Sequence, residues 1–382
     1  MRNESDTNLD YSKTLPNELG WCLREVIQPY RHLPNNQTTL PEPLPTISPP
    51  IADTAESGQQ DLAYPHDHAP TNFITSVATM PSYELRSFAE KSKMAGGGQI
   101  TAKLMVQILT SYPGMLRDPN SPPPFIHHSS MKSLPGCETR ATESLSTCTS
   151  LMQLLGSGTP GSRRLVWKNI RLECERLYVD WMNPDKWELL SSMQALLIYM
   201  MLRLQDGENT HNNFDVLLLS AMWVVACSMN HKIGNLECGS PTGLSYGNTY
   251  DDWIFEESRR RLAITFRTIG MLFSTEPASG CSLDSSFLLA PLPASKLLWD
   301  APSEAQWLVE KNRDRRGESV FGIRMGGAMV KLDRSEDTFT RYGLNAGQME
   351  EEKSKSSANW AEWCAGMDGL GALVMLAASL PV

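Results

Sequence analysis

Closely spaced cysteine pairs are missing from this chain of 382 residues. It contains eight cysteines, but no two of them form a C-x-x-C motif. A structural zinc site needs ligands close together in sequence, because a short loop then directs both thiolates at one ion. Two histidine pairs, His66/His68 and His127/His128, have no cysteine pair beside them. The sequence therefore predicts no metal site and no cofactor, and these residues provide neither a zinc cluster nor a classical zinc finger.

Positive charge is also scarce. The 34 Lys and Arg residues are outnumbered by 43 Asp and Glu residues, which gives a net charge of -9. An acidic chain does not attract the phosphates of DNA unless it carries a local basic patch. The two best candidates are Arg259–Arg261 and Lys311–Arg316, but acidic residues accompany both. We predict that both are solvated helix faces.

No long hydrophobic run and no secretion signal is visible. The N-terminus, MRNESDTNLD, is polar, so we expect an intracellular, reducing environment and free thiols. The most apolar internal run, Phe214–Cys227, is too short to span a membrane and contains Asp215. The apolar tail Gly369–Val382 is also short. We predict that both are core helices and that the protein has no membrane partner.

Recognisable catalytic motifs are absent, so the sequence predicts that the protein is not an enzyme. The segment Gly156–Gly161 matches G-x-G-x-x-G, but a helix is predicted before it and Pro160 disturbs its turn, which indicates a helix–helix loop. The alternative is a helical small-molecule-binding protein or a terpene-synthase-like enzyme. Asp251-Asp252 begins an aspartate-rich magnesium motif, but Phe255 stands where the third acid belongs.

Composition divides the chain into two regions. Residues 1–82 are rich in Pro, Ser, Thr and Asn, which predicts a mostly disordered segment, although it contains one apolar island from Leu19 to Ile27. That island is either a helix that docks on the body or a linear interaction motif. Residues 83–382 have helical periodicity and no convincing strand pattern. The predicted fold is therefore all-α, an irregular multi-helix bundle with long loops.

Several helix boundaries follow from local signals. Asn183 and Pro184 suit the cap and first position of one helix, Ser303 and Gln306 form a capping box, and a last helix is predicted from Asn359. The span 317–357 is predicted to be mostly irregular. The predicted helices cover 83–96, 99–111, 143–155, 166–181, 184–205, 214–229 and 251–274.

Charged residues accompany the apolar stripe of the predicted helix 251–274. The pairs Glu256/Arg260 and Glu257/Arg261 are four residues apart in the favourable order. Such pairs contribute only a few tenths of a kcal/mol, roughly, when they are exposed. We therefore interpret them as supports of the helix rather than as an effector site.

A family resemblance rests on the order of several short motifs. Trp253–Arg261, with the sequence WIFEESRRR, resembles the signature in the middle homology region of fungal transcription factors. Leu292–Trp299 and Ala305–Trp307 look like the proline loop and paired tryptophans of that family. Further similar segments are Tyr112–His127, Leu190–Leu202 and Trp360–Leu376. The resemblance covers about residues 85–382.

The resemblance implies a helical regulatory domain in the nucleus, a transcriptional regulator of a fungal biosynthetic gene cluster. It implies other transcription factors or co-regulators as partners, in a homodimer or heterodimer. Where the family carries its zinc module, this chain has a Pro-rich segment with Cys22, which leaves direct DNA contact open and favours action through a partner. A co-regulator, a duplicate without fingers and an incompletely assigned gene remain alternatives. The family-motif residues, expected to be structural or regulatory, are Trp253, Glu256, Glu257, Arg260, Arg261, Pro293, Trp299 and Trp307.

Overall fold

The computed structural model describes 88, 98–131, 143–159, 161–179, 185–233, 249–273, 275, 287–313, 320–332 and 346–380, with only the backbone of 346–353. All of these residues belong to one compact unit, Ala78–Val382. Of the described residues, 71% lie in α-helices, which confirms the predicted helical fold. The predicted disordered segment 1–82, with its apolar island, and the predicted helix 83–96, apart from Phe88, lie outside the described residues.

Helices α3 (Glu143–Gly156), α4 (Ser162–Val179), α5 (Lys186–Asp206) and α6 (Asp215–Ile233) form one helical layer. α5 packs against α3 and α6, and α4 packs against α3 and α6. From Leu189 to Arg203 every side chain of α5 is buried, which explains why this helix is apolar around most of its circumference. α2 (Gly98–Met115) packs along α5.

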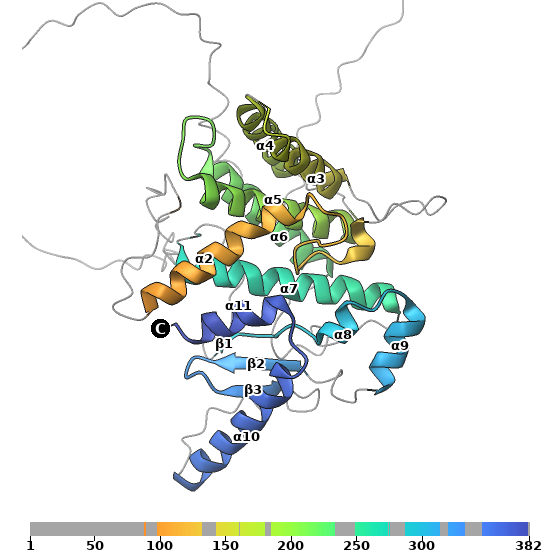
Figure 1. The fold of residues 1–382 in the computed structure, drawn as a ribbon, viewed down its shortest axis with the longest axis vertical. Coiled ribbons are helices and arrows are strands. Elements are labelled where there is room, and N and C mark those ends of the chain that lie inside the picture. The colour runs from red at the N-terminus through yellow and green to blue at the C-terminus, as the bar shows by residue number, and fades with distance from the viewer. Residues whose placement is uncertain are drawn as a thin grey trace, which may run out of the picture. The chain divides into compact units, whose positions relative to one another are not determined.

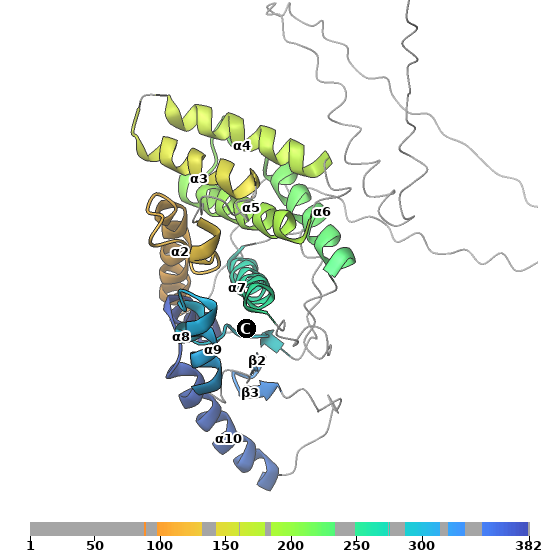
Figure 2. The same cartoon turned by 90° about the vertical axis from the view of Figure 1, so that its right-hand side faces the viewer.

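α7 (Tyr250–Leu272) lies beneath that layer and above the elements from residue 287 onward, as the two perpendicular views show (Figures 1 and 2). It contacts α5 on one side and α11 (Gly369–Ala378) on the other. Its N-cap is Thr249, whose hydroxyl accepts a hydrogen bond from the Asp252 amide. α7 therefore joins the helical layer to the C-terminal elements, together with α2, which also packs against both α5 and α11.

A small antiparallel sheet lies on the far side of α7 and corrects the prediction that no strands are present. Its order is β1 (Phe287–Leu289), β2 (Val320–Arg324), β3 (Met329–Leu332). In β2 both faces are buried, so its sequence does not alternate between apolar and polar residues. A Cβ atom at Gly322 would approach the Phe287 ring within 2.9 Å, which explains the glycine there.

The other helices among the described residues are η3 (His128–Met131), α8 (Lys296–Trp299), α9 (Glu304–Arg313) and α10 (Ala346–Cys364). β2, β3 and the first part of α10 occupy the span that was predicted to be irregular, so that prediction is wrong. α10 packs against β3 and projects away from α7 (Figure 1).

Two predicted helix starts are also wrong. The N-cap of α5 is Asp185, whose carboxylate accepts bonds from the amides of Trp187 and Glu188. The last predicted helix, from Asn359, is in fact two helices. α10 starts earlier, at Ala346, and ends at Cys364, and Asp368 then caps α11 by accepting bonds from the amides of Leu370 and Gly371. Half of the predicted capping box is present: the Ser303 hydroxyl accepts a 3.4 Å bond from the Gln306 amide, whereas the Gln306 side chain donates to Glu310 at 3.0 Å.

Among the described helices, α6 alone is long and apolar enough to cross a membrane. It packs against α4 and α5, and half of the relevant window is buried inside the protein. This packing explains its apolar composition, in agreement with the predicted core helix.

Candidate functional site

Three consecutive arginines of α7 lie inside the protein. Arg259, Arg260 and Arg261 are 6%, 2% and 0% exposed, so the predicted solvated face is a buried one. Glu257 is also fully buried. Burying charge is costly unless each group finds partners, so the surroundings of these side chains decide what they do.

The ion pairs of α7 differ in part from the predicted set. Glu257 Oε1 accepts a 2.8 Å bond from Arg261 Nε, as predicted, and its Oε2 accepts a 2.6 Å bond from Arg260. Glu256 pairs with Arg259, three residues along, rather than with Arg260. Instead of two separate pairs on an exposed helix face, the buried carboxylate of Glu257 accepts bonds from two guanidinium groups, those of Arg260 and Arg261.

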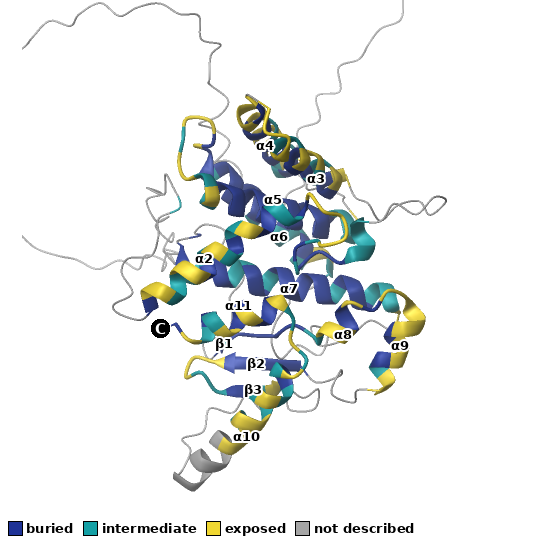
Figure 3. Cartoon of the chain, viewed as in Figure 1, coloured by how far each residue is buried: buried dark blue, intermediate teal, exposed yellow. Residues whose placement is uncertain are grey.

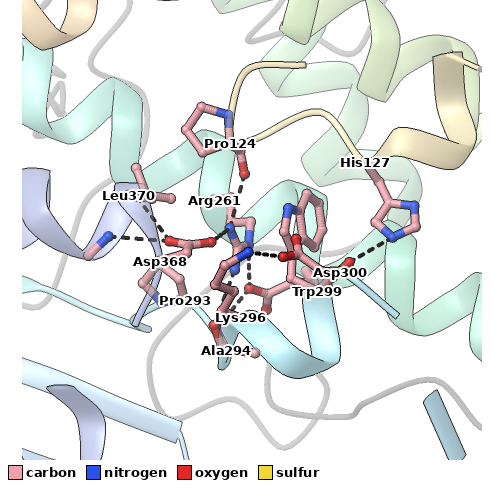
Figure 4. Close-up of polar contacts among 12 residues, drawn as sticks. Pro124, His127, Arg261, Pro293, Ala294, Lys296, Trp299, Asp300, Asp368 and Leu370 are labelled. Atoms are coloured by element: carbon pink, nitrogen blue, oxygen red, sulfur yellow. Dashed lines mark hydrogen bonds and ion pairs between the residues drawn. The ribbon is translucent and has the colours of Figure 1, made fainter. Parts of the chain in front are cut away.

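Arg261 connects four separate segments (Figure 4). Besides Glu257, its Nη1 donates to Asp368 Oδ2 at 2.5 Å and to the Pro124 carbonyl at 3.1 Å. Its Nη2 donates to the Ala294 carbonyl at 3.1 Å. The planar guanidinium also lies 4.1 Å from the centre of the Trp299 ring, in cation–π geometry. We call Arg261, these side chains and the two carbonyls the Arg261 hub.

Both carboxylates of the hub have a second task. Glu257 Oε1 also accepts a 2.8 Å bond from the Ala294 amide, which fixes the loop before α8. Asp368 is the N-cap of α11. Burial, followed by the nearby charge of Asp368, raises the pKa of the Tyr112 hydroxyl on α2. Disturbing either carboxylate therefore affects secondary structure as well as charge pairing.

Further hydrogen bonds join the same segments around the hub. His127 Nε2 lies 3.0 Å from the Trp299 carbonyl, and Trp363 Nε1 donates to the Pro293 carbonyl at 3.2 Å. The Lys296 amide donates to the Gly366 carbonyl at 2.7 Å. The loop 121–128, the loop 290–300 and the α10–α11 break are thus fastened to one another as well as to α7.

The predicted tryptophans form an aromatic cluster next to the hub. Trp253, Trp299 and Trp307 are buried, and the Trp253 ring centre lies 6.5 Å from that of Trp299 and 5.9 Å from that of Trp307. Trp307 Nε1 is buried and makes no hydrogen bond. These rings are core anchors of a second hydrophobic cluster. Pro293 lies in the loop that the hub holds.

The acidic pair that suggested an enzyme lies at the N-terminus of α7. Asp252 accepts a 2.7 Å bond from Lys186 Nζ, and the Thr249 hydroxyl donates to its other oxygen at 2.7 Å. These bonds, that from Lys186 foremost, lower the pKa of Asp252. Phe255 is buried against Trp187. Within the described part of the chain no cluster of three or more His, Cys, Asp or Glu residues could hold a metal ion.

Sequence reasoning missed Asp368, His127 and the carbonyls of Pro124 and Ala294 as parts of the site. The two carbonyls could not be predicted, because every residue has a backbone carbonyl and the sequence does not show which of them accept a side-chain bond. Asp368 had one available signal, because an aspartate directly before an apolar run is a helix N-cap.

The geometry of the hub supports cross-linking rather than a reaction. Its charged groups are engaged with one another or with the backbone, and Arg261 and Glu257 have no exposed surface. Comparisons of the chain with protein-family models, curated proteins and solved structures found no match.

Proposed function

We propose that this protein is a nuclear transcriptional regulator that acts through partner proteins by means of its helical domain. The observation that carries the proposal is the convergence of the family-like segments. Pro124, Glu257 with Arg261, Ala294 and Asp368 come from four of those segments and meet in one buried hub. A fifth segment bonds to the first of these through Gln194, which donates to the Phe125 carbonyl at 2.9 Å, and the sixth contributes Trp307, whose ring packs against that of Trp253.

This convergence supports the resemblance because short motifs gain weight when they share one physical role. Motifs that matched by chance would have no reason to meet in space. Here residues up to 244 positions apart bond to the same guanidinium group.

Action through a partner is supported by the charges. The protein is acidic overall, and the basic run Arg259–Arg261 is buried, so that run provides no surface for phosphate. A partner that binds DNA would supply the missing contact. Control of a biosynthetic gene cluster belongs to the proposal through the resemblance alone.

A tethering assay tests regulation without knowledge of target genes. The full chain is fused to a heterologous DNA-binding domain, and transcription of a reporter is measured in a fungal host. We expect a change of at least about threefold, roughly 0.65 kcal/mol by RT ln 3, in either direction. The variant Asp368→Asn should weaken the effect, whereas Arg171→Ala on the surface of α4 should leave it intact.

Chromatin immunoprecipitation of the tagged protein in its own host provides the second test. We expect enrichment at promoters that is lost when the partner is removed. Binding of a specific promoter by the purified chain alone would contradict the need for a partner. A stable, nuclear protein that changes neither the reporter nor any transcript would contradict the regulatory function.

A further inference from the structure

Helix α4 exposes apolar side chains on the side opposite to its buried face. Val166, Trp167, Ile170, Cys174 and Leu177 form the buried face. Leu165, Leu172 and Val179 are 50%, 53% and 68% exposed. We call these three residues the α4 stripe. Figure 3 shows α4 at the edge of the helical layer with exposed residues along it.

The spacing of the stripe is regular. Its residues follow at intervals of seven, which correspond to nearly two full turns, so they remain aligned along the whole helix. Single exposed apolar residues are ordinary on protein surfaces. Three in line on the outermost side of one helix, across its full length, form the seam typical of helix pairing.

Charges beside the stripe are arranged symmetrically. Lys168 and Glu175 lie on the same side of it, and the helical period of 100° per residue places them within about 20° of each other around the axis. Along the helix, the midpoint between Lys168 and Glu175 falls between residues 171 and 172. The midpoint between Leu165 and Val179 is Leu172 itself, so the two midpoints nearly coincide. A two-fold axis through Leu172 therefore relates apolar residue to apolar residue and cation to anion.

We propose that the α4 stripe is a self-association surface on which a second copy of this chain docks, with the two α4 helices antiparallel. Leu172 meets Leu172 of the second copy at the axis, and Leu165 meets Val179 of the second copy at each end. Lys168 then faces Glu175 of the second copy, twice. Such a surface is isologous, since one patch serves both subunits.

The charge pattern decides between the arrangements and occupants. In a parallel pair the two-fold axis runs along the helices, so Lys168 and Glu175 of the two copies lie on opposite sides of the seam and do not pair. An acidic helix from another protein would leave Glu175 facing like charge. An antiparallel second copy pairs both charges together, and Glu175 also pairs with Arg171 of its own helix at 3.0 Å.

The expected dimer is weak, because a single pair of five-turn helices falls below the roughly 1,200 Å² typical of stable interfaces. We expect a dissociation constant on the order of 10–100 μM. The surface lies apart from the Arg261 hub, so its failure would leave the proposed function untouched.

Sedimentation velocity of the full chain over a wide concentration range tests the proposal. The variant Leu172→Glu should raise the dissociation constant at least about tenfold, a change of about 1.4 kcal/mol. Leu104→Glu on α2 is the matched control, since Leu104 is 50% exposed and lies on a different helix. It should leave the dissociation constant within about twofold.

A charge exchange tests the antiparallel geometry. Lys168→Glu and Glu175→Lys should each weaken the dimer about three- to tenfold, and the double variant should restore it. Equal mixtures of the two single variants should associate more tightly than either variant alone.

Two results would overturn the proposal. One is a chain that stays monomeric at all concentrations reached. In that case, protection of α4 from hydrogen exchange would indicate that another segment of the chain covers the stripe. Absence of that protection would indicate that a different protein binds there. The other is a dimer that is indifferent to Leu172→Glu or is not restored by the double charge exchange.

Discussion

In most soluble proteins charged side chains are exposed and large apolar side chains are buried, and α7 and α4 each depart from one half of this rule. In α7 charged side chains are buried, whereas on α4 apolar side chains are exposed. The buried charges of α7 all find partners within the same unit, so they hold its segments in one arrangement. The exposed apolar residues of α4 have no such partners among the residues that the structure describes. The comparison separates a region that maintains the fold from one that is available to another molecule.

Removing the central guanidinium should give the largest difference between the two helices. Arg261→Ala should destabilise the protein by about 3–5 kcal/mol, because it leaves Asp368 and three other acceptors without their donor. Arg171→Ala on α4 removes an ion pair that is 44% and 46% exposed and should cost less than about 1 kcal/mol. Urea unfolding followed by circular dichroism measures both. Equal losses would contradict the central role of the hub.

Substitutions of Asp368 separate its charge from its capping role. Asp368→Asn keeps an oxygen that can cap α11 but loses the ionic bond to Arg261, which should cost about 1.5–3 kcal/mol. Asp368→Ala should cost about 1 kcal/mol more, because the cap is lost as well. The same unfolding measurement applies. If the two variants were equally stable, the cap would contribute nothing to the fold.

Two tryptophans allow a matched test of one hydrogen bond. Trp363→Phe and Trp307→Phe remove similar volumes from buried sites, but only the Trp363 indole donates to a carbonyl, that of Pro293. Trp363→Phe should therefore be more destabilising by about 1 kcal/mol. Unfolding free energies of the two variants give this difference directly, and the reverse order would contradict the assignment.

The smallest effect concerns pH and another buried ion pair, Arg203–Asp215, whose Nε–Oδ1 distance is 2.8 Å. Burial raises the pKa of Asp215 above 3.8. The charge of Glu208 acts in the same direction, whereas Arg203 and the Phe88 amide lower this pKa without cancelling the effect of burial. A raised acid pKa means that its contribution to stability is present below pH 3.8 and is lost as pH rises through the folded-state pKa. Relative to Asp215→Asn, the wild type should therefore gain stability as pH falls towards 3.8.

Asp252 provides a control with the opposite sign. Lys186 and Thr249 lower the pKa of Asp252, so its contribution is present above pH 3.8 and is lost as pH falls through the folded-state pKa. Relative to Asp252→Asn, the wild type should lose stability on acidification. Unfolding titrations between pH 3 and pH 7 compare both pairs of proteins, and trends of the same sign would contradict this assignment.

The helices could be predicted because their signals are local. α3, α5, α6 and α7 lie within a few residues of the predicted spans, and the described residues between α3 and α4, Ser157–Thr159 and Gly161, form a helix–helix connection as predicted. The strands could not be predicted in the same way. β2 is buried on both faces and β1 has three residues, so neither shows an alternating pattern.

The sequence by itself determined the helical class, the absence of paired cysteines and the position of the main helix-forming segments, because composition and periodicity act over short distances. Only the tertiary structure decided which charges are buried. The pattern Glu257-x-x-x-Arg261 is compatible with an exposed helix face, and it became a hub because the loops at Pro124, Ala294 and Asp368 bring their acceptors to it. Bonds between residues more than a hundred positions apart depend on how the whole chain packs, which no local pattern encodes.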